Sequence, residues 1–273
     1  MKLDMISRYP ETTRKPVPLL FLHGSFSDAR VWDDNFLPFF AQHGYEAHAF
    51  SLRGHGRSDG LERLHSWRLA DYVADLVKVA ASFPVPPVLI GHSMGGMVIQ
   101  KYLETHRHAA ALVLMASVPP QGLMSTSMHM AMRHPFLFQQ LAQLSLLGPK
   151  FGTPEILRKI LFSRDMPDDK LHDYFRYMQA ESQVVSMDMM APNMLKLKPE
   201  TLQIPVLALG AHHDVLVAPT FVEQTARFYK AEFHIFRDMA HAMMLDTHWL
   251  KAAEYLLAWL ERISHEQPAG VAR

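Results

Sequence analysis

A short motif, Gly91-His92-Ser93-Met94-Gly95, lies between a segment with a strand pattern and a segment with a helical pattern. The three apolar residues at 88–90 that precede it are typical of a buried strand, and after it apolar residues recur at helical spacing through Tyr102. A serine between glycines at such a junction is typical of a tight, strained turn that lifts the hydroxyl clear of the backbone. The motif alone arises by chance in long chains, but its place between a strand and a helix makes Ser93 the candidate nucleophile.

The other apolar segments predict an α/β fold, in which helices cover both faces of a mostly parallel sheet. Continuous apolar runs, typical of buried strands, alternate with amphipathic helical patterns. The expected strands lie at 3–9, 17–22, 45–52, 88–90, 111–115, 204–209 and 231–236, and the expected helices at 31–42, 69–83, 219–229 and 248–263. The segment before Val17 has room for one strand or for two very short ones.

This alternation stops between residues 122 and 202. Short helical patterns broken by prolines replace it, and ten of the 18 methionines lie there. We therefore expect a core formed by residues 1–118 and 203–273, with a helical cap at 119–202 inserted before the last two core strands. Ligands of parallel sheets bind beyond the carboxyl ends of the strands, so this cap is expected to cover the active site.

A serine hydroxyl is a weak nucleophile that needs an adjacent base, and the base needs an orienting acid. In folds with this strand-turn-helix junction, the order along the chain is serine, acid, histidine. Asp214 and His241 each follow a predicted strand, in that order after Ser93. We assign Asp214 as the orienting acid and His241 as the general base, with Asp188 and Asp246 as alternative acids that fit the chain order poorly.

The oxyanion that forms when a serine attacks a carbonyl needs two N–H donors already in place. One expected donor is the N–H of Met94, directly after the nucleophile. The other is the N–H of Ser25, in the loop after the first long apolar strand. The expected substrate pocket includes Phe26, Met124 and Met128.

Metal and thiol chemistry find little support in the sequence. His212 and His213 beside Asp214 resemble a metal cluster, but adjacent histidines seldom chelate one ion and no third ligand is suitably spaced. The chain has no cysteine, which excludes disulfides and thiolate catalysis. We expect neither a metal nor a cofactor.

Five motifs, in this order, resemble those of the α/β-hydrolase superfamily. They are His23-Gly24, the run Arg-Gly-His-Gly-Arg-Ser at 53–58, the Ser93 motif, Asp214 with Val217-Ala218-Pro219, and His241. The resemblance runs from about Val17 to Ile263 and implies a Ser-His-Asp hydrolase with a variable cap. The layout is similar to the lysophospholipase, monoacylglycerol-lipase and carboxylesterase branches, although the hairpin that usually leads the fold looks truncated.

The resemblance and the methionine-rich cap together favour an esterase. Methionine side chains are flexible and polarizable, which suits an apolar, variable ligand, although the same residues also fit a purely packing role. We expect a small-molecule ester as partner, with an apolar or medium to long acyl chain, cleaved through an acyl-enzyme. A cofactor-free C–C bond hydrolase, a perhydrolase or haloperoxidase-type enzyme, and a ligand-binding receptor with a slow hydrolase site stay open as alternatives.

Charge and hydropathy limit the other partners. The formal net charge is zero, so no long-range field favours nucleic acid. The N-terminus lacks the apolar segment of a secretory signal, and no apolar run reaches the length of a membrane span. We therefore expect a cytoplasmic protein without a transmembrane segment, and the sequence leaves its oligomeric state open.

Overall fold

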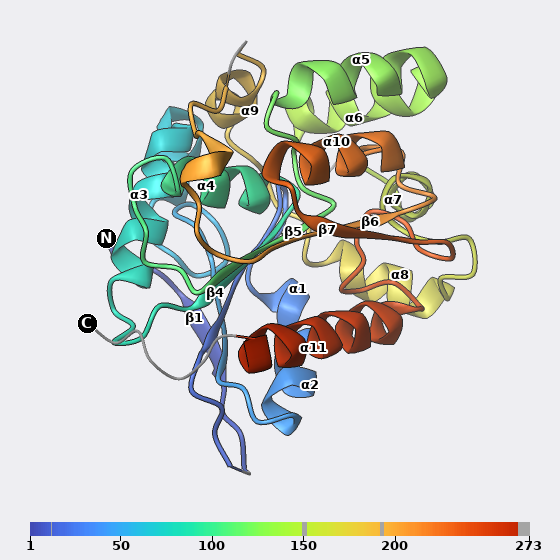
Figure 1. Cartoon of the computed structure of the whole chain (residues 1–273). Helices are drawn as coiled ribbons and strands as arrows, with labels where there is room; N and C mark the ends of the chain where they lie inside the picture. Colours follow the sequence, from blue (N-terminus) through green and yellow to red (C-terminus); the bar gives the residue numbers. More distant parts are fainter. Residues whose placement is uncertain (12, 149–151, 192–193, 267–273) are drawn as a thin grey trace.

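The computed structural model describes residues 1–11, 13–148, 152–191 and 194–266. In this part of the chain seven strands form one sheet in the order β1-β3-β2-β4-β5-β6-β7 (Figure 1). Strand β1 runs antiparallel to β3, and the other pairs are parallel. The strands are β1 (Met5–Arg8), β2 (Leu19–Leu22), β3 (Ala47–Phe50), β4 (Val88–His92), β5 (Ala111–Met115), β6 (Val206–Ala211) and β7 (Glu232–Phe236). The prediction of a mostly parallel α/β sheet is confirmed.

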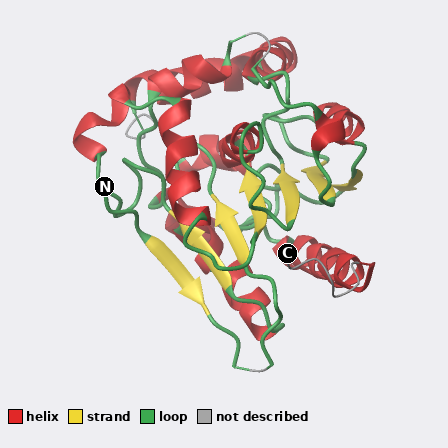
Figure 2. Ribbon diagram, turned by 60° about the vertical axis from the view of Figure 1, so that its left-hand side comes forward, coloured by secondary structure: helices red, strands yellow, loops and turns green. Residues whose placement is uncertain are grey.

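Helices cover both faces of the sheet, which explains why β2 to β5 are buried at every position (Figure 2). In β2, Leu19 and Phe21 pack into one apolar cluster, whereas Leu20 and Leu22 pack into the cluster on the opposite face. The first cluster includes residues of α1 (Arg30–Asp33), α2 (Phe36–Gln42) and α11 (Trp249–Glu266), and the second includes residues of α3 (Leu69–Ala80) and α4 (Met94–Tyr102). Helix α10 (Pro219–Tyr229) packs against β6.

The prediction of a single helix at 31–42 is wrong in one respect, because the structure has two helices there, α1 and α2. Asn35 has non-helical backbone angles, with φ −132° and ψ −59°. Its side-chain amide donates to the carbonyl of Met244, 3.0 Å away, in a segment distant along the chain. This long-range hydrogen bond stabilises the non-helical backbone at Asn35, and the local sequence pattern does not predict the break.

Among the described residues, five α-helices lie between β5 and β6, and we call them the inserted helices. They are α5 (Leu123–Arg133), α6 (Pro135–Leu147), α7 (Pro154–Leu161), α8 (Asp168–Phe175) and α9 (Gln183–Met189). Elsewhere in the described ranges, the helical segments include two short 3₁₀ helices, η1 (Leu61–Ser66) and η3 (Pro199–Thr201). That residues 119–202 form a separate cap domain stays a prediction. No helix in the described ranges is both long enough and apolar enough to cross a lipid bilayer.

Candidate active site

Ser93 lies at the junction of β4 and α4 with a left-handed backbone, φ 52° and ψ −118°. This conformation is strained for a serine and persists only where the surroundings enforce it. The Ser93 N–H donates to the carbonyl of Met115 on β5, and the Ser93 carbonyl accepts from the N–H groups of Gly96 and Val118, each at 3.1 Å. Strand β5 and the loop after it therefore hold the strained turn.

The glycines around Ser93 are required by close backbone packing. A Cβ atom at Gly91 would lie 2.6 Å from the backbone nitrogen of Gly96. A Cβ at Gly95 would collide with the carbonyl oxygen of His23, and one at Gly96 would collide with Ser117. The strand, the turn and the helix are closer together than any side chain allows, as a nucleophile elbow requires.

His241 and Asp214 are brought together although 27 residues separate them. Nδ1 of His241 lies 2.8 Å from Oδ2 of Asp214, and both side chains are buried. The second oxygen, Oδ1, accepts the N–H groups of Leu216 and Val217, each at 2.8 Å. A carboxylate only accepts hydrogen bonds, so Nδ1 of His241 carries a hydrogen, and in a neutral imidazole this tautomer leaves Nε2 as the acceptor.

The two alternative acids have partners other than the ring of His241, although Asp246 also accepts the N–H of Ala240, next to His241, at 3.3 Å. Asp246 is fully buried and accepts from the N–H and the hydroxyl of Ser163, at 2.9 and 3.0 Å. Asp188, on α9, forms an ion pair with the exposed Arg68. Chain order therefore pointed to the acid that contacts His241.

His92, inside the motif, joins the elbow to the loop of His241. Its Nε2 lies 3.0 Å from the carbonyl oxygen of His241, and the two rings are 4.7 Å apart. Burial, helped by the neighbouring His241, lowers the pKa of His92 well below its usual value. His92 therefore stays neutral and donates from Nε2, fixing the backbone that carries the candidate base.

A cavity of about 420 Å³ lies beside the elbow. Ser93 and His241 both line it, together with Ser25 and Phe26. The inserted helices form much of the remaining wall, which is predominantly apolar. Their lining residues include Thr126, Met130, Phe138, Leu141, Leu144, Ile156, Leu157, Ile160, Tyr174 and Met187.

The two predicted pocket methionines do not line this cavity. The exposed fractions of Met124 and Met128 are 49% and 57%. They are four residues apart on one face of α5, whereas Thr126 and Met130 share the opposite face and reach the cavity. The abundance of methionine was visible in the sequence, but the face that each residue occupies was not.

The two residues predicted to supply oxyanion donors are neighbours. The hydroxyl of Ser25 donates to the sulfur of Met94, 3.3 Å away. Met94 is fully buried at the start of α4, and Ser25 lies at the cavity wall. Phe26, the next residue, has a left-handed backbone with φ 62°, which is strained for an aromatic residue.

Sequence reasoning missed Glu181, a buried carboxylate at the cavity wall. It accepts from the hydroxyl of Tyr72 at 2.8 Å, the N–H of Ser182 at 2.7 Å and Nε2 of His55 at 3.2 Å. Nδ1 of His55 donates to the carbonyl of Arg53, so both ring nitrogens are donors and His55 is an imidazolium. His55 belongs to a motif noted in the sequence, but no local signal marks Glu181 as its partner.

Metal ligation finds no support in the described residues, where no three His, Asp or Glu side chains gather closely enough to hold an ion.

Comparison with known proteins identifies the family. Residues 19–253 match the alpha/beta hydrolase family. Over 111 residues the sequence is 39% identical to a non-heme chloroperoxidase of Streptomyces lividans, which covers 39% of each chain, so the chain spans about two fifths of the length of this curated relative. Similar solved structures include an esterase from Exiguobacterium antarcticum (TM-score 0.75) and a bromoperoxidase from Bacillus anthracis (TM-score 0.76), each 18% identical with 95% of both chains covered. The family match covers most of the chain and agrees with the fold and the tight turn at Ser93, so the chain belongs to the alpha/beta hydrolase family.

Proposed function

We propose that this protein is a serine esterase that cleaves carboxylic esters through an acyl-enzyme on Ser93. The observation that carries the proposal is the buried 2.8 Å contact between His241 and Asp214, made beside a cavity that Ser93 and His241 both line. This arrangement favours a base at the cavity wall and an acid that fixes its tautomer. We also propose that the protein acts in the cytoplasm.

The reaction proceeds in two halves. Nε2 of His241 takes the hydroxyl proton as Ser93 attacks the ester carbonyl, and His241 then gives this proton to the departing alcohol, leaving an acyl ester on Ser93. Water, deprotonated by His241, attacks the acyl-enzyme, and the proton returns to Ser93 as the carboxylic acid is released. Asp214 stabilises the imidazolium in both halves without taking its proton.

The N–H groups of Ser25 and Met94 stabilise the oxyanion of each tetrahedral intermediate. The hydrogen bond between the side chains of Ser25 and Met94 shows that the two residues are neighbours, which supports this role. Loss of one such donor costs about 2.7–4 kcal/mol of transition-state stabilisation in a comparable hydrolase.

The cavity favours an apolar acyl group. Its wall carries aliphatic and aromatic side chains from α5, α6 and α7, and its volume of about 420 Å³ is in the range of small-molecule sites. We propose that the inserted helices act as the cap over a substrate with a medium or long acyl chain.

Steady-state hydrolysis of p-nitrophenyl esters from acetate to palmitate tests this proposal, with Ser93→Ala as the control. We expect turnover that is highest for a chain longer than acetate, and a fall of roughly 10³–10⁶-fold in the variant. Equal turnover by the wild type and Ser93→Ala would overturn the assignment of Ser93 as nucleophile. Turnover that does not favour any ester longer than acetate would overturn the proposal of an apolar acyl chain. A folded protein without turnover on any ester would favour C–C bond hydrolysis or a receptor.

Similarity to the non-heme chloroperoxidase supports a second candidate, perhydrolysis on the same residues. Hydrogen peroxide would then replace water in the second half, attack the acyl-enzyme and release a peracid. The test is peracid formation from acetate or an ester with peroxide, in the wild type and in Ser93→Ala. A peroxide reaction faster than hydrolysis would favour this candidate over the esterase.

A further inference from the structure

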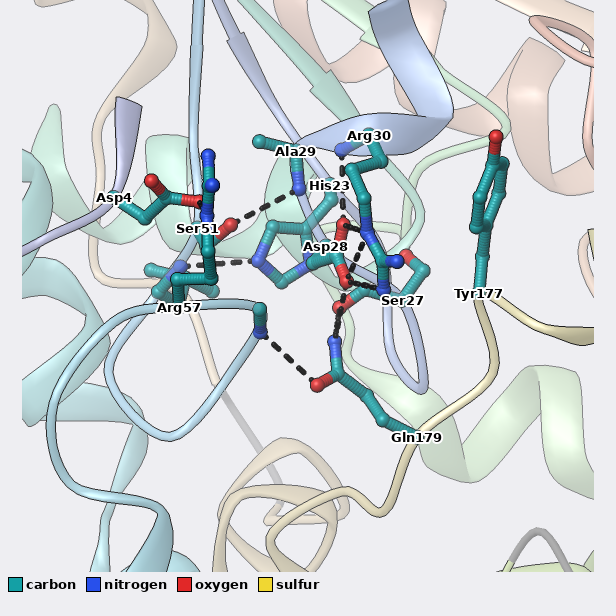
Figure 3. A network of polar contacts seen from close by, with 12 residues as sticks. Asp4, His23, Ser27, Asp28, Ala29, Arg30, Ser51, Arg57, Tyr177 and Gln179 are labelled. Carbon is teal, nitrogen blue, oxygen red and sulfur yellow. Dashed lines mark hydrogen bonds and ion pairs between the residues drawn. The ribbon is translucent and has the colours of Figure 1, made fainter. Parts of the chain in front are cut away.

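Gln179 connects the segment after α8 to two loops of the core (Figure 3). Its Nε2 donates to the carbonyl of Ser27 at 2.7 Å and to Oδ2 of Asp28 at 3.2 Å. Its Oε1 accepts the N–H of Gly56 at 3.0 Å. One side chain thus uses its donor and its acceptor to join the loop after β2 to the loop after β3.

The backbone of Gln179 reaches the same loop after β2. Its N–H donates to the carbonyl of Phe26 at 3.0 Å. Phe26 is the residue with the strained left-handed backbone, and it directly follows Ser25. A strained conformation requires support from its surroundings. Gln179, which is distant from Phe26 along the chain, provides this support through the hydrogen bond to the Phe26 carbonyl.

The ends of this loop are held by contacts between residues close together in the chain. The carbonyl of Gly24 accepts from Nδ1 of His23 at 2.8 Å and from the hydroxyl of Ser27 at 3.0 Å. At the other end, the carboxylate of Asp28 is held by the guanidinium of Arg30 (Figure 3). Within the described residues, the carbonyls of Phe26 and Ser27 in between receive their hydrogen bonds from Gln179.

We propose that Gln179 is a positioning residue for the oxyanion hole, which sets the direction of the Ser25 N–H through Ser27. Gln179 holds the carbonyl of Ser27, and the Ser27 hydroxyl bonds the carbonyl of Gly24, which belongs to the same peptide as the Ser25 N–H. The inference rests on the proposed function, in which Ser25 is an oxyanion donor. The segment that connects the inserted helices therefore contributes to reactivity as well as to the wall of the cavity.

This role predicts a loss in the chemical step rather than in substrate binding. In the ground state the substrate is bound mainly through its acyl chain, in the apolar cavity. The Ser25 N–H acts on the charge that develops on the carbonyl oxygen in the transition state. A displacement of about 1 Å at a catalytic group costs about 10²-fold. Removing the Gln179 amide is therefore expected to lower kcat by about 10- to 100-fold, with KM changed less than about 3-fold.

The test uses Gln179→Met, which keeps the length of the side chain and the backbone N–H but removes the amide. The matched control is Arg68→Met, which removes another contact between the core and an inserted helix, the ion pair with Asp188 on α9. Both are compared with the wild type for kcat and KM on p-nitrophenyl butyrate, and for inhibition by an alkyl trifluoromethyl ketone, whose adduct with serine carries an oxyanion. Gln179→Asn keeps an amide that is one methylene too short, and it serves as a second variant with the same expected loss.

The expected result is a parallel loss of kcat and of ketone affinity in the Gln179 variants, with Arg68→Met within about 2-fold of the wild type. Unchanged kcat and ketone affinity in a folded Gln179 variant would overturn the inference. An equal loss in Arg68→Met would also overturn it, because general docking of the inserted helices would then explain the effect. Failure of the proposed function is a different result: the wild type itself would show no turnover and no ketone inhibition, and the inference would fall with it.

Discussion

Nε2 of His55 lies 3.2 Å from Oε2 of Glu181, and neither side chain is accessible to solvent. Burial opposes the charge of His55, but contact with Glu181 outweighs it and raises the pKa of the imidazole. Burial likewise opposes ionisation of Glu181, but His55 and the hydroxyl of Tyr72 outweigh it and lower the pKa of this carboxyl. A charged pair therefore joins the core to the segment between α8 and α9.

Replacement of Glu181 by Gln is expected to destabilise the protein by about 3–5 kcal/mol, because it leaves the His55 charge buried without its partner. Urea unfolding of the wild type and the variant measures the difference. Arg68→Met, which breaks a solvent-exposed ion pair, is the control and should change the free energy of unfolding far less. Equal effects of the two substitutions would contradict a charged pair at His55.

The pair also predicts how stability depends on pH. The raised pKa of His55 stabilises the fold fully below the usual value of 6.5 and loses this effect as pH rises through the higher folded value. The lowered pKa of Glu181 stabilises the fold above the usual value of 4.5 and loses this effect as pH falls through the lower folded value. The difference in unfolding free energy between wild type and Glu181→Gln should therefore be greatest between about pH 4.5 and 6.5 and shrink on either side. A difference that is constant from pH 4 to 9 would rule out this pair as its source.

Asp214→Asn tests the role of the acid without removing its bulk. The amide leaves His241 in the wrong tautomer, and kcat is expected to fall by about 10⁴-fold. The matched control is Asp246→Asn, because Asp246 is buried and accepts from Ser163 and from the N–H of Ala240 rather than from the ring of His241. We expect the control to lower the free energy of unfolding while keeping kcat within about 10-fold. The reverse pattern, with activity lost only in Asp246→Asn, would mean that the acid is assigned to the wrong residue.

Two methionines on α5 differ in their surroundings and allow the role of the cavity to be tested. Met130 is buried at the cavity wall, whereas Met132 is 73% exposed. Met130→Trp should fill part of the cavity and shift the preferred p-nitrophenyl ester to a shorter acyl chain. Met132→Trp should leave the preference unchanged. Identical chain-length profiles for both variants would show that the acyl group binds elsewhere.

The sequence predicted those parts of the fold and site that depend on local patterns. Continuous apolar runs located the strands because both faces of the sheet are covered, and Ser93 was marked by glycines that close packing requires. Asp214 and His241 could be paired from chain order, since both follow parallel strands at one edge of the sheet.

The missed features depend on contacts between distant segments. Gln179 and Glu181 lie in a region without strand periodicity, and the core residues that their side chains bond are 109 to 152 residues away. The break at Asn35 depends on a carbonyl 209 residues away. Single-sequence patterns report which residues are apolar and at what spacing, but not which loop a polar side chain reaches.

The most direct test of the central claim is to trap the acyl-enzyme. The protein is mixed with p-nitrophenyl butyrate, quenched in acid within the first turnover, and measured by intact mass and peptide mapping. The account predicts a single butyryl group on Ser93, reduced to background in Ser93→Ala. An active wild type that carries no acyl group, or carries it on another residue, would contradict the proposed mechanism.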